Sequence, residues 1–112
     1  MAGTPEHPIT ITPHAGEVRV LHDGREIVRT RNALSLQEAN YAAVLYVPRA
    51  DADMSLLTPN PKSTRCGYKG DASYFDLPGA PGAVWSYEAP LADVGEIAGH
   101  LAFYPDKVTI ET

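Results

Sequence analysis

Cysteine is nearly absent from this sequence, in which Cys66 is the single one among 112 residues. One cysteine excludes an intrachain disulfide, and it excludes a zinc site built from paired C-x-x-C motifs. A chain without disulfides is typical of a reducing compartment, so we expect a cytoplasmic protein.

The sequence also lacks long hydrophobic runs and an excess of basic residues. No stretch approaches the roughly 20 apolar residues that a membrane-spanning helix needs, and residues 1–12 have no signal-peptide pattern. Fourteen acidic residues against nine basic ones give a net charge of −5. Such a chain is atypical of proteins that bind nucleic acid or anionic membranes, and we expect neither partner.

Proline and glycine, in contrast, are abundant. Ten prolines and nine glycines interrupt the chain at short intervals, which disfavours long helices and favours short strands joined by tight turns. Hydrophobic residues make up 44% of the chain, enough for one core at this length. We therefore predict one mainly β domain over residues 9–112, a barrel or two packed antiparallel sheets, after a frayed start at residues 1–8.

Asp23-Gly24 is the clearest local signal, because it separates the strand-like runs Val18–His22 and Arg25–Thr30. A type I′ turn needs positive φ at both central positions, which Asp-Gly tolerates, so these runs predict a hairpin. The prolines at positions 59 and 61 predict a loop over residues 58–63. Further strands are predicted at residues 9–12, 44–48, 72–77, 83–88, 100–104 and 108–111, the last two as a hairpin, and helical turns at 51–57 and 92–97.

Residues 32–40 settle on no single period, and Asn32 or Ser35 would cap a helical turn there. A strand and a single helical turn therefore both stay open for this stretch.

Several segments match, in order, those of a known family. They are YVPRAD at 46–51, TRCGYKGDASY at 64–74, AVWSYEAP at 83–90 and IAGHLAFY at 97–104, after a similar opening hairpin at 18–31. In these the chain resembles the domain-of-unknown-function 427 family of small bacterial and fungal proteins, and Thr-x-Cys-x-Tyr-Lys-Gly is the specific part. The family label mentions nucleotidyltransferases, and we attach no mechanism to that label.

The resemblance implies a β-tent, a fold of two packed sheets with one or two short helical turns, and a strand within residues 32–40. This fold is related to small zinc-binding guanine-exchange-factor-like and methionine-sulfoxide-reductase domains. Those relatives often hold zinc through two C-x-x-C pairs, which this chain lacks. Gly67 stands where a proline commonly follows the cysteine.

Cations, a thiol and hydroxyls gather in one short span of this otherwise acidic chain. Lys69 would hold a phosphate or carboxylate as a point charge, although Gly67 and Gly70 lack the spacing of a P-loop. Arg49 would clamp such a group in bidentate fashion or form a structural bridge to Asp51, Asp71 or Glu88. We predict a concave ligand-binding face formed by Arg49, Lys62, Thr64, Cys66, Tyr68, Lys69, Tyr74 and Trp85.

Cys66 is the candidate nucleophile or redox centre. Arg65 and Lys69 are cations close to it in sequence, and His100 would be the base if the last hairpin lies alongside. The alternative is a small buried hydrophobic side chain, the more common state of a free cysteine.

Asp51-x-Asp53 follows a predicted buried strand, as the metal-binding carboxylates of a nucleotidyl-transfer site would. The Gly-Ser pair expected before such a site is missing, so a helix cap is the simpler interpretation. The histidines show no metal-binding spacing, and we expect His7, His14 and His22 to be solvated. We expect no metal and no cofactor.

Aromatic residues alternate on the predicted strands. Trp85 and Tyr87 share one face of their strand, and together with Tyr46 and Tyr74 they either line a ligand pocket or form the core. The core interpretation is preferred for Trp85, and both stay open for Tyr74.

Three hypotheses of function follow. The leading one is binding of a small or anionic ligand on the concave face around the Thr-x-Cys-x-Tyr-Lys-Gly motif. The second is an enzyme that uses Cys66, with His100 as the candidate base. The third is a non-catalytic interaction or assembly module, in which an exposed strand edge at residues 9–12 or 108–111 pairs with another copy.

Overall fold

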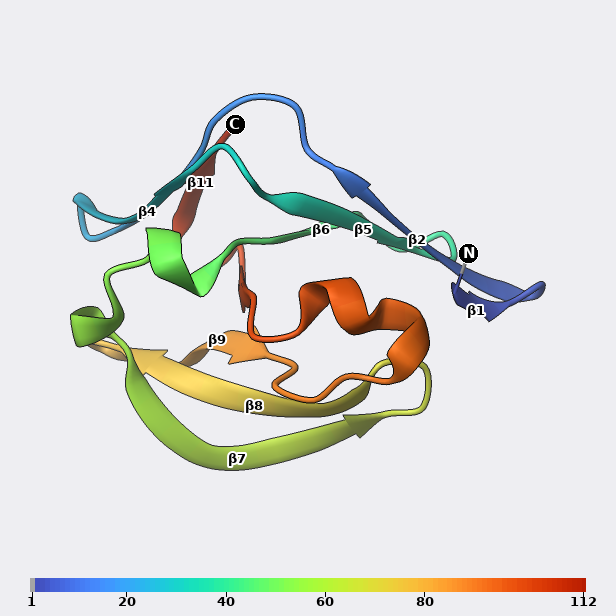
Figure 1. Ribbon diagram of the computed structural model, residues 1–112. Coiled ribbons are helices and arrows are strands. Elements are labelled where there is room, and N and C mark those ends of the chain that lie inside the picture. Colours follow the sequence, from blue (N-terminus) through green and yellow to red (C-terminus); the bar gives the residue numbers. More distant parts are fainter. Residues whose placement is uncertain (1) are drawn as a thin grey trace.

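The computed structural model describes residues 2–112, and the short strands expected from the glycine and proline spacing dominate it (Figure 1). The strands form three antiparallel sheets. The first has the order β1-β2-β5-β6, from Ala2–Thr4, His7–Pro13, Leu34–Glu38 and Val44–Tyr46. The second has the order β10-β9-β8-β7, from Leu101–Phe103, Ala80–Ser86, Gly70–Leu77 and Thr58–Cys66. The third has the order β11-β3-β4, from Thr109–Glu111, Val18–His22 and Arg25–Thr30.

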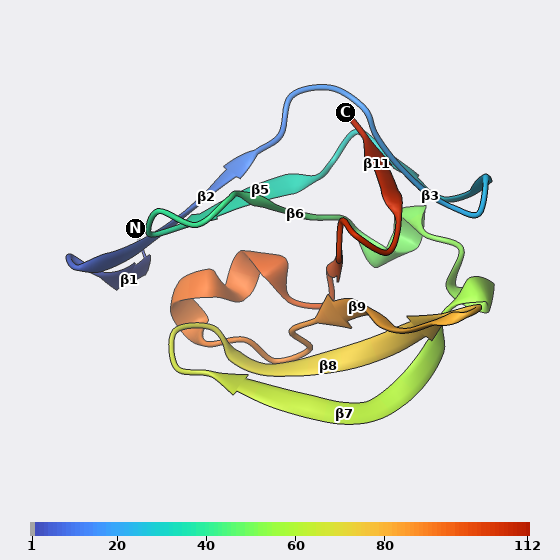
Figure 2. The same cartoon turned by 180° about the vertical axis from the view of Figure 1, so that it is seen from behind.

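Two layers result from these sheets. The first and third sheets lie on one side, and β7, β8 and β9 lie on the other, as Figures 1 and 2 show from opposite sides. Val47, just after β6, joins the layers by exchanging two backbone hydrogen bonds of 2.8 Å with Leu101 of β10. The described strands do not close into a barrel, and the mainly β prediction is confirmed.

Three short 3₁₀ helices complete the fold: η1 (Arg49–Asp51), η2 (Met54–Leu56) and η3 (Ala92–Ile97). The predicted cap is confirmed at η2, where the side chain of Asp53 accepts a hydrogen bond from the backbone N–H of Ser55. Within residues 2–112 no helix has the length and apolar character to cross a bilayer.

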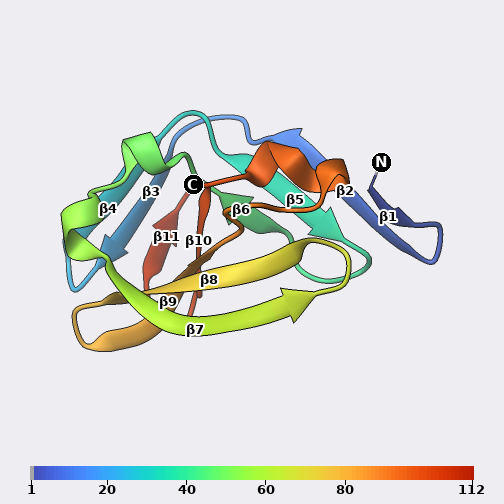
Figure 3. The same ribbon diagram turned by 60° about the horizontal axis from the view of Figure 1, so that its bottom comes forward.

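Two clusters of buried side chains form the core between the layers. The first lies under the β3–β4 hairpin and includes Val18, Val20, Ile27, Val28, Leu77, Val84, Leu101 and Phe103. The second lies under β2 and β5, where η3 closes the space between the layers, and includes Ile9, Leu36, Tyr46, Tyr74, Tyr87, Val94 and Ile97. β8, β9 and β10, strands of one sheet that can be followed in Figure 3, contribute to both clusters, so one sheet supports the whole interior.

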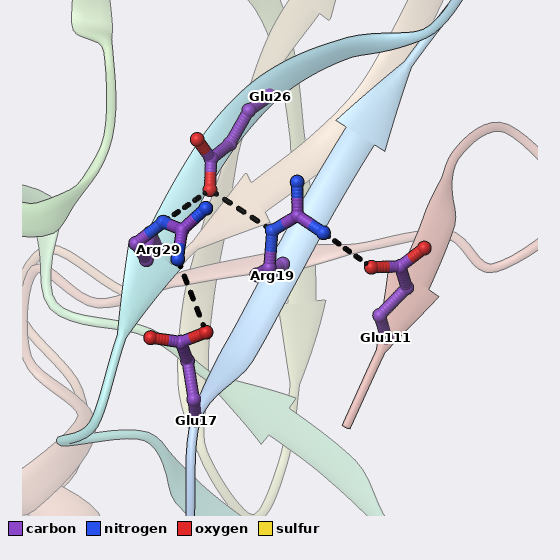
Figure 4. Close-up of polar contacts among 5 residues, drawn as sticks. All are labelled: Glu17, Arg19, Glu26, Arg29 and Glu111. Carbon is purple, nitrogen blue, oxygen red and sulfur yellow. Dashed lines mark hydrogen bonds and ion pairs between the residues drawn. The ribbon is translucent and has the colours of Figure 1, made fainter.

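The predicted hairpin is confirmed as β3 and β4. Asp23 and Gly24 have φ values of 52° and 77°, as the turn type requires. An exposed ion-pair network covers the outer face of this sheet (Figure 4). Glu26 Oε1 accepts hydrogen bonds from Arg19 and Arg29, Arg19 also reaches Glu111 on β11 at 2.7 Å, and Arg29 reaches Glu17 at 3.3 Å.

The loop predicted over residues 58–63 is wrong, because this segment is part of strand β7. Thr58, Pro59 and Asn60 pair with β8, the register then shifts, and pairing resumes at Ser63. Proline is tolerated here because β7 is the edge of its sheet, where one side of the strand needs no hydrogen-bond donors.

The hairpin predicted for residues 100–111 is also wrong. β10 pairs with β9, whereas β11 pairs with β3 in a different sheet. The segment between them therefore crosses from one sheet to another, which local turn residues do not reveal.

The amino-terminal segments also differ from the expectation. Residues 2–4, placed by the sequence pattern in a frayed start, form β1 against β2, with Ala2 opposite Ile9 and both side chains buried. Residues 9–12 were considered as an exposed edge, but β2 lies between β1 and β5. Residues 34–38 adopt the strand alternative as β5.

Candidate functional site

Aromatic side chains from both layers converge on one cavity of about 260 Å³, which we call the tyrosine pocket. Five of the six tyrosines and the single tryptophan line it, together with one acidic and one basic residue. The lining residues are Leu36, Glu38, Tyr41, Ala42, Val44, Tyr46, Lys69, Tyr74, Trp85, Tyr87 and Tyr104.

Strand register brings these rings together. Tyr74 of β8 lies directly opposite Trp85 of β9, and the small side chain of Ala102 lies on the other side of Trp85, on β10. Trp85 and Tyr46 meet edge to face with ring centroids 6.4 Å apart, and the indole N–H of Trp85 donates to the Tyr46 hydroxyl at 3.3 Å. The ring of Tyr104 lies 4.6 Å from that of Trp85.

A buried ion pair between Lys69 and Glu38 forms one wall of the pocket. The two side chains are 9% and 16% exposed, and Lys69 Nζ donates to Glu38 Oε1. The second carboxylate oxygen of Glu38 lies 2.7 Å from His7 Nε2. Burial by itself would raise the pKa of Glu38, but the hydrogen bonds from Lys69 and His7 outweigh it and hold that pKa below the ordinary value.

His7 therefore does not have the solvated environment expected from the sequence. Its ring stacks on Tyr68 with centroids 4.0 Å apart and planes 11° apart, and its edge faces Tyr41. No local sequence pattern predicts these contacts, because His7, Glu38 and Tyr68 belong to three segments that are far apart in the chain. His22 is likewise largely buried, with Nε2 2.8 Å from the carbonyl oxygen of Pro78.

The hydroxyl groups of the pocket differ in their hydrogen bonds. The Tyr74 hydroxyl lies 2.8 Å from that of Thr64. Tyr46 is almost fully buried, and burial raises its pKa to about 12. Tyr87 is 6% exposed, and its hydroxyl has no hydrogen-bond partner among residues 2–112. Burial also raises the pKa of Tyr87, so both phenols stay protonated near neutral pH and act as donors.

The structure brings seven of the eight predicted ligand-binding residues to this region. Lys69, Tyr74 and Trp85 line the pocket. The other four lie next to these residues. Thr64 bonds the Tyr74 hydroxyl, Lys62 lies over the Tyr74 ring at 4.6 Å, and Cys66 packs against the second core cluster. Tyr68 stacks on His7, which in turn contacts Glu38.

Arg49 lies elsewhere and adopts the structural bridge considered above. Its guanidinium forms a bidentate pair with Glu88, with contacts of 3.1 and 2.6 Å, and lies over the ring of Phe75. It is therefore not among the residues that line the tyrosine pocket.

Cys66 and His100 are not brought together. Cys66 ends β7 at one edge of the second sheet, and His100 precedes β10 at the opposite edge. Three strand spacings of about 4.8 Å separate those edges, so the side chains are on the order of 14 Å apart. His100 Nδ1 instead lies 3.2 Å from the carbonyl oxygen of Ala98, and within the described chain no hydrogen bond joins His100 to Cys66. The condition under which His100 would act as the base, a last hairpin alongside Cys66, is not met.

Asp51 and Asp53 serve the local fold. Asp53 caps η2, and Asp51 accepts a hydrogen bond from the Thr30 hydroxyl at 2.7 Å. Among residues 2–112 no group of three or more histidine, cysteine or acidic side chains gathers as a metal site would require.

Glu38 and Tyr104 are the main pocket residues that the sequence did not single out. Glu38 has a recognisable signal in retrospect, since Leu34, Leu36 and Glu38 alternate along β5 and share its buried face. A carboxylate at the end of such a face requires a cation across the core, and Lys69 provides it.

Comparison with known proteins adds the family. The family described as "Domain of unknown function (DUF427)" matches residues 10–112. A comparison with curated proteins gave no match. The matched region runs from β2 to β11 and contains every residue that lines the tyrosine pocket, so this chain belongs to the DUF427 family.

Proposed function

We propose that this protein binds a small molecule in the tyrosine pocket. The observation that carries the proposal is the convergence of five tyrosines and the only tryptophan on one concave site. Small-molecule sites in proteins are typically concave, lined by aromatic and apolar groups, and supplied with a few fixed polar groups. At about 260 Å³ the pocket suits a compact ligand.

The pairing of the cations in the predicted binding segments supports recognition by rings and hydroxyls rather than by a free cation. Lys69 is paired with Glu38, Arg49 with Glu88 and Arg65 with Asp71. Among the described residues Lys62 has no carboxylate partner; it lies over the Tyr74 ring and is not part of the pocket lining. A binding site for a multiply charged anion would leave its cations unpaired, so this arrangement favours a ligand that is neutral or singly charged.

The Thr-x-Cys-x-Tyr-Lys-Gly motif supplies Lys69 to the lining of this site. Residues 67–69 turn the chain from β7 into β8, and the carbonyl of Lys69 accepts a 2.9 Å hydrogen bond from Leu91. Gly70 has a φ of +115°, and a Cβ there would lie 3.4 Å from the backbone of Pro90 and Leu91. Because glycine has no Cβ, the turn can lie close to the backbone of Pro90 and Leu91. In this position of the turn Lys69 reaches the pocket.

Trp85 makes the proposal testable, because the only tryptophan reports directly on the pocket. Its fluorescence is titrated with four compounds that share a benzene ring: toluene, acetophenone, benzoate and benzylamine. We expect a saturable change with at least one of them. The matched variants are Ala42→Phe, which places a ring in the pocket from an exposed lining position, and Ala43→Phe, which adds the same ring at an exposed neighbour outside the lining.

Ala42→Phe is expected to weaken binding at least tenfold, and Ala43→Phe to leave it unchanged. The proposal fails if none of the four compounds gives a saturable signal, or if Ala42→Phe binds as tightly as the wild type.

A further inference from the structure

We propose that the ligand of the tyrosine pocket presents an acceptor oxygen, from a carbonyl or a carboxylate group, to the hydroxyls of Tyr87 and Tyr46. This inference rests on the proposed function and specifies the chemical class of the ligand. It follows from the balance of hydrogen-bond donors and acceptors inside the pocket.

Tyr87 provides the first observation. The residue is 6% exposed and lines the pocket, and its hydroxyl has no hydrogen-bond partner among residues 2–112. In this part of the chain the one enclosed side-chain polar atom without a partner is Arg49 Nε, so the Tyr87 hydroxyl is open to the pocket. A phenol that opens on the pocket and that the protein does not use is free to donate to a group of the ligand.

Tyr46 provides the second observation. Its oxygen already accepts the indole N–H of Trp85, so the group that it has left to offer is its own O–H. Tyr46 and Tyr87 both line the tyrosine pocket and belong to the same core cluster. The two phenols therefore present donors to one pocket.

The carboxylate of Glu38 and the hydroxyl of Tyr74, in contrast, already take part in hydrogen bonds. One oxygen of Glu38 is bonded by Lys69 and the other by His7. The Tyr74 hydroxyl is bonded to that of Thr64. Lys69 has three N–H donors and places one on Glu38, so it adds to the free donors of Tyr46 and Tyr87. A ligand with an acceptor oxygen bonds these free donors, whereas a ligand whose polar group only donates leaves them unused.

The rings around these donors describe the rest of the ligand. Tyr74, Trp85 and Tyr104 present aromatic surface beside the two phenols. Such surfaces favour a flat or apolar body, so we infer a compact aryl-like or otherwise planar molecule that carries a carbonyl or carboxylate.

The test measures the dissociation constants of the same four compounds for the wild type and for Tyr87→Phe, by Trp85 fluorescence. Acetophenone and benzoate share the ring with toluene and add an acceptor oxygen, while benzylamine adds a charged donor. We expect acetophenone or benzoate, or both, to bind at least tenfold more tightly than toluene and benzylamine. The tighter of the two shows whether the natural group is a neutral carbonyl or a carboxylate.

Tyr87→Phe is expected to reduce the preference for the oxygen-bearing compounds over toluene by about fivefold to tenfold, since one hydrogen bond contributes roughly 1 kcal/mol. The dissociation constant of toluene is expected to stay unchanged. Tyr68→Phe is the matched control, because Tyr68 is the one tyrosine outside the pocket lining and removal of its hydroxyl is expected to keep the preference. Both variants are first compared with the wild type in thermal unfolding, where Tyr87→Phe should be no less stable because it breaks no hydrogen bond within the described chain.

The outcomes separate the two proposals. If toluene binds as tightly as the oxygen-bearing compounds, or if Tyr87→Phe weakens all compounds equally, the pocket is a binding site but the acceptor-oxygen inference is wrong. If no compound binds, the proposed function itself fails.

Discussion

Lys69 and Glu38 are largely buried as a pair of opposite charges. Either charge alone would be expensive to bury, and each is nevertheless largely withdrawn from water. Their hydrogen bond, together with the contact from His7 to the second carboxylate oxygen, offsets the free-energy cost of burying both charges. The pair holds β5 against the turn between β7 and β8, and so positions one wall of the tyrosine pocket.

Lys69→Met tests this role through its pH dependence. Because the folded pKa of Glu38 is lowered, the stability that its carboxylate contributes is present above its ordinary pKa of 4.5 and is lost as the pH falls through the folded value. At pH 7 the variant leaves a buried carboxylate without its main partner, and we expect the free energy of unfolding to fall by about 3 kcal/mol. The deficit should shrink as the pH falls through the lowered folded pKa of Glu38 and its carboxylate becomes protonated.

Urea unfolding at pH 7 and pH 3.5 measures the effect. Lys62→Met is the control, since Lys62 is exposed and has no carboxylate partner in the described chain, and a change within about 0.5 kcal/mol is expected. Equal losses in the two variants, or a loss independent of pH, would contradict the assigned role of the ion pair.

At the scale of elements, local turn chemistry and long-range pairing act separately. The β3–β4 hairpin forms where Asp23 and Gly24 both adopt positive φ, a property of two adjacent residues. The partner of β11, in contrast, lies near the beginning of the chain, on β3. Short strands between turns were therefore predictable, whereas the sheet to which β11 belongs was not.

Gly24→Ala separates backbone conformation from packing at this turn. A Cβ at Gly24 meets no atom within 4 Å, so its cost comes from the left-handed backbone with φ of +77°. We expect a loss of about 1 kcal/mol in the free energy of unfolding. Gly67→Ala is the matched control: its Cβ also meets nothing within 4 Å, but its φ lies outside the left-handed region, so stability should be unchanged or slightly raised. Chemical denaturation of both variants measures this, and similar losses would refute the conformational explanation.

The molecule as a whole is held together by one shared sheet. The two core clusters lie under different parts of the upper layer, yet β8, β9 and β10 contribute side chains to both. Neither cluster has a supporting sheet of its own, so we expect the chain to unfold as one cooperative unit.

Ile27→Ala tests this cooperativity, because Ile27 belongs to the first cluster and Trp85 packs against the second. Loss of a buried isoleucine side chain should cost roughly 3 kcal/mol. Trp85 fluorescence and far-ultraviolet circular dichroism should report the same shifted midpoint in urea. Arg31→Ala, at an exposed position, should leave both midpoints unchanged. Two separate transitions in Ile27→Ala would show that the clusters unfold independently.

The features that depend on a few adjacent residues could be predicted from the sequence. Glycine and proline spacing determined the mainly β class, Asp23-Gly24 the hairpin, and Asp53 a helix cap, because turn geometry and capping are local. It also singled out Lys69, Tyr74 and Trp85, three residues that line the pocket.

The tertiary structure was needed to know which of these features meet. It placed the proline-containing segment at a sheet edge, separated Cys66 from His100, paired Arg49 with Glu88, and brought Glu38 to Lys69. It also placed the Tyr87 hydroxyl at the pocket without a hydrogen-bond partner in the described chain. Such contacts join segments that are far apart in the chain, and which segments meet depends on how all the strands together bury the apolar surface, which no single segment encodes.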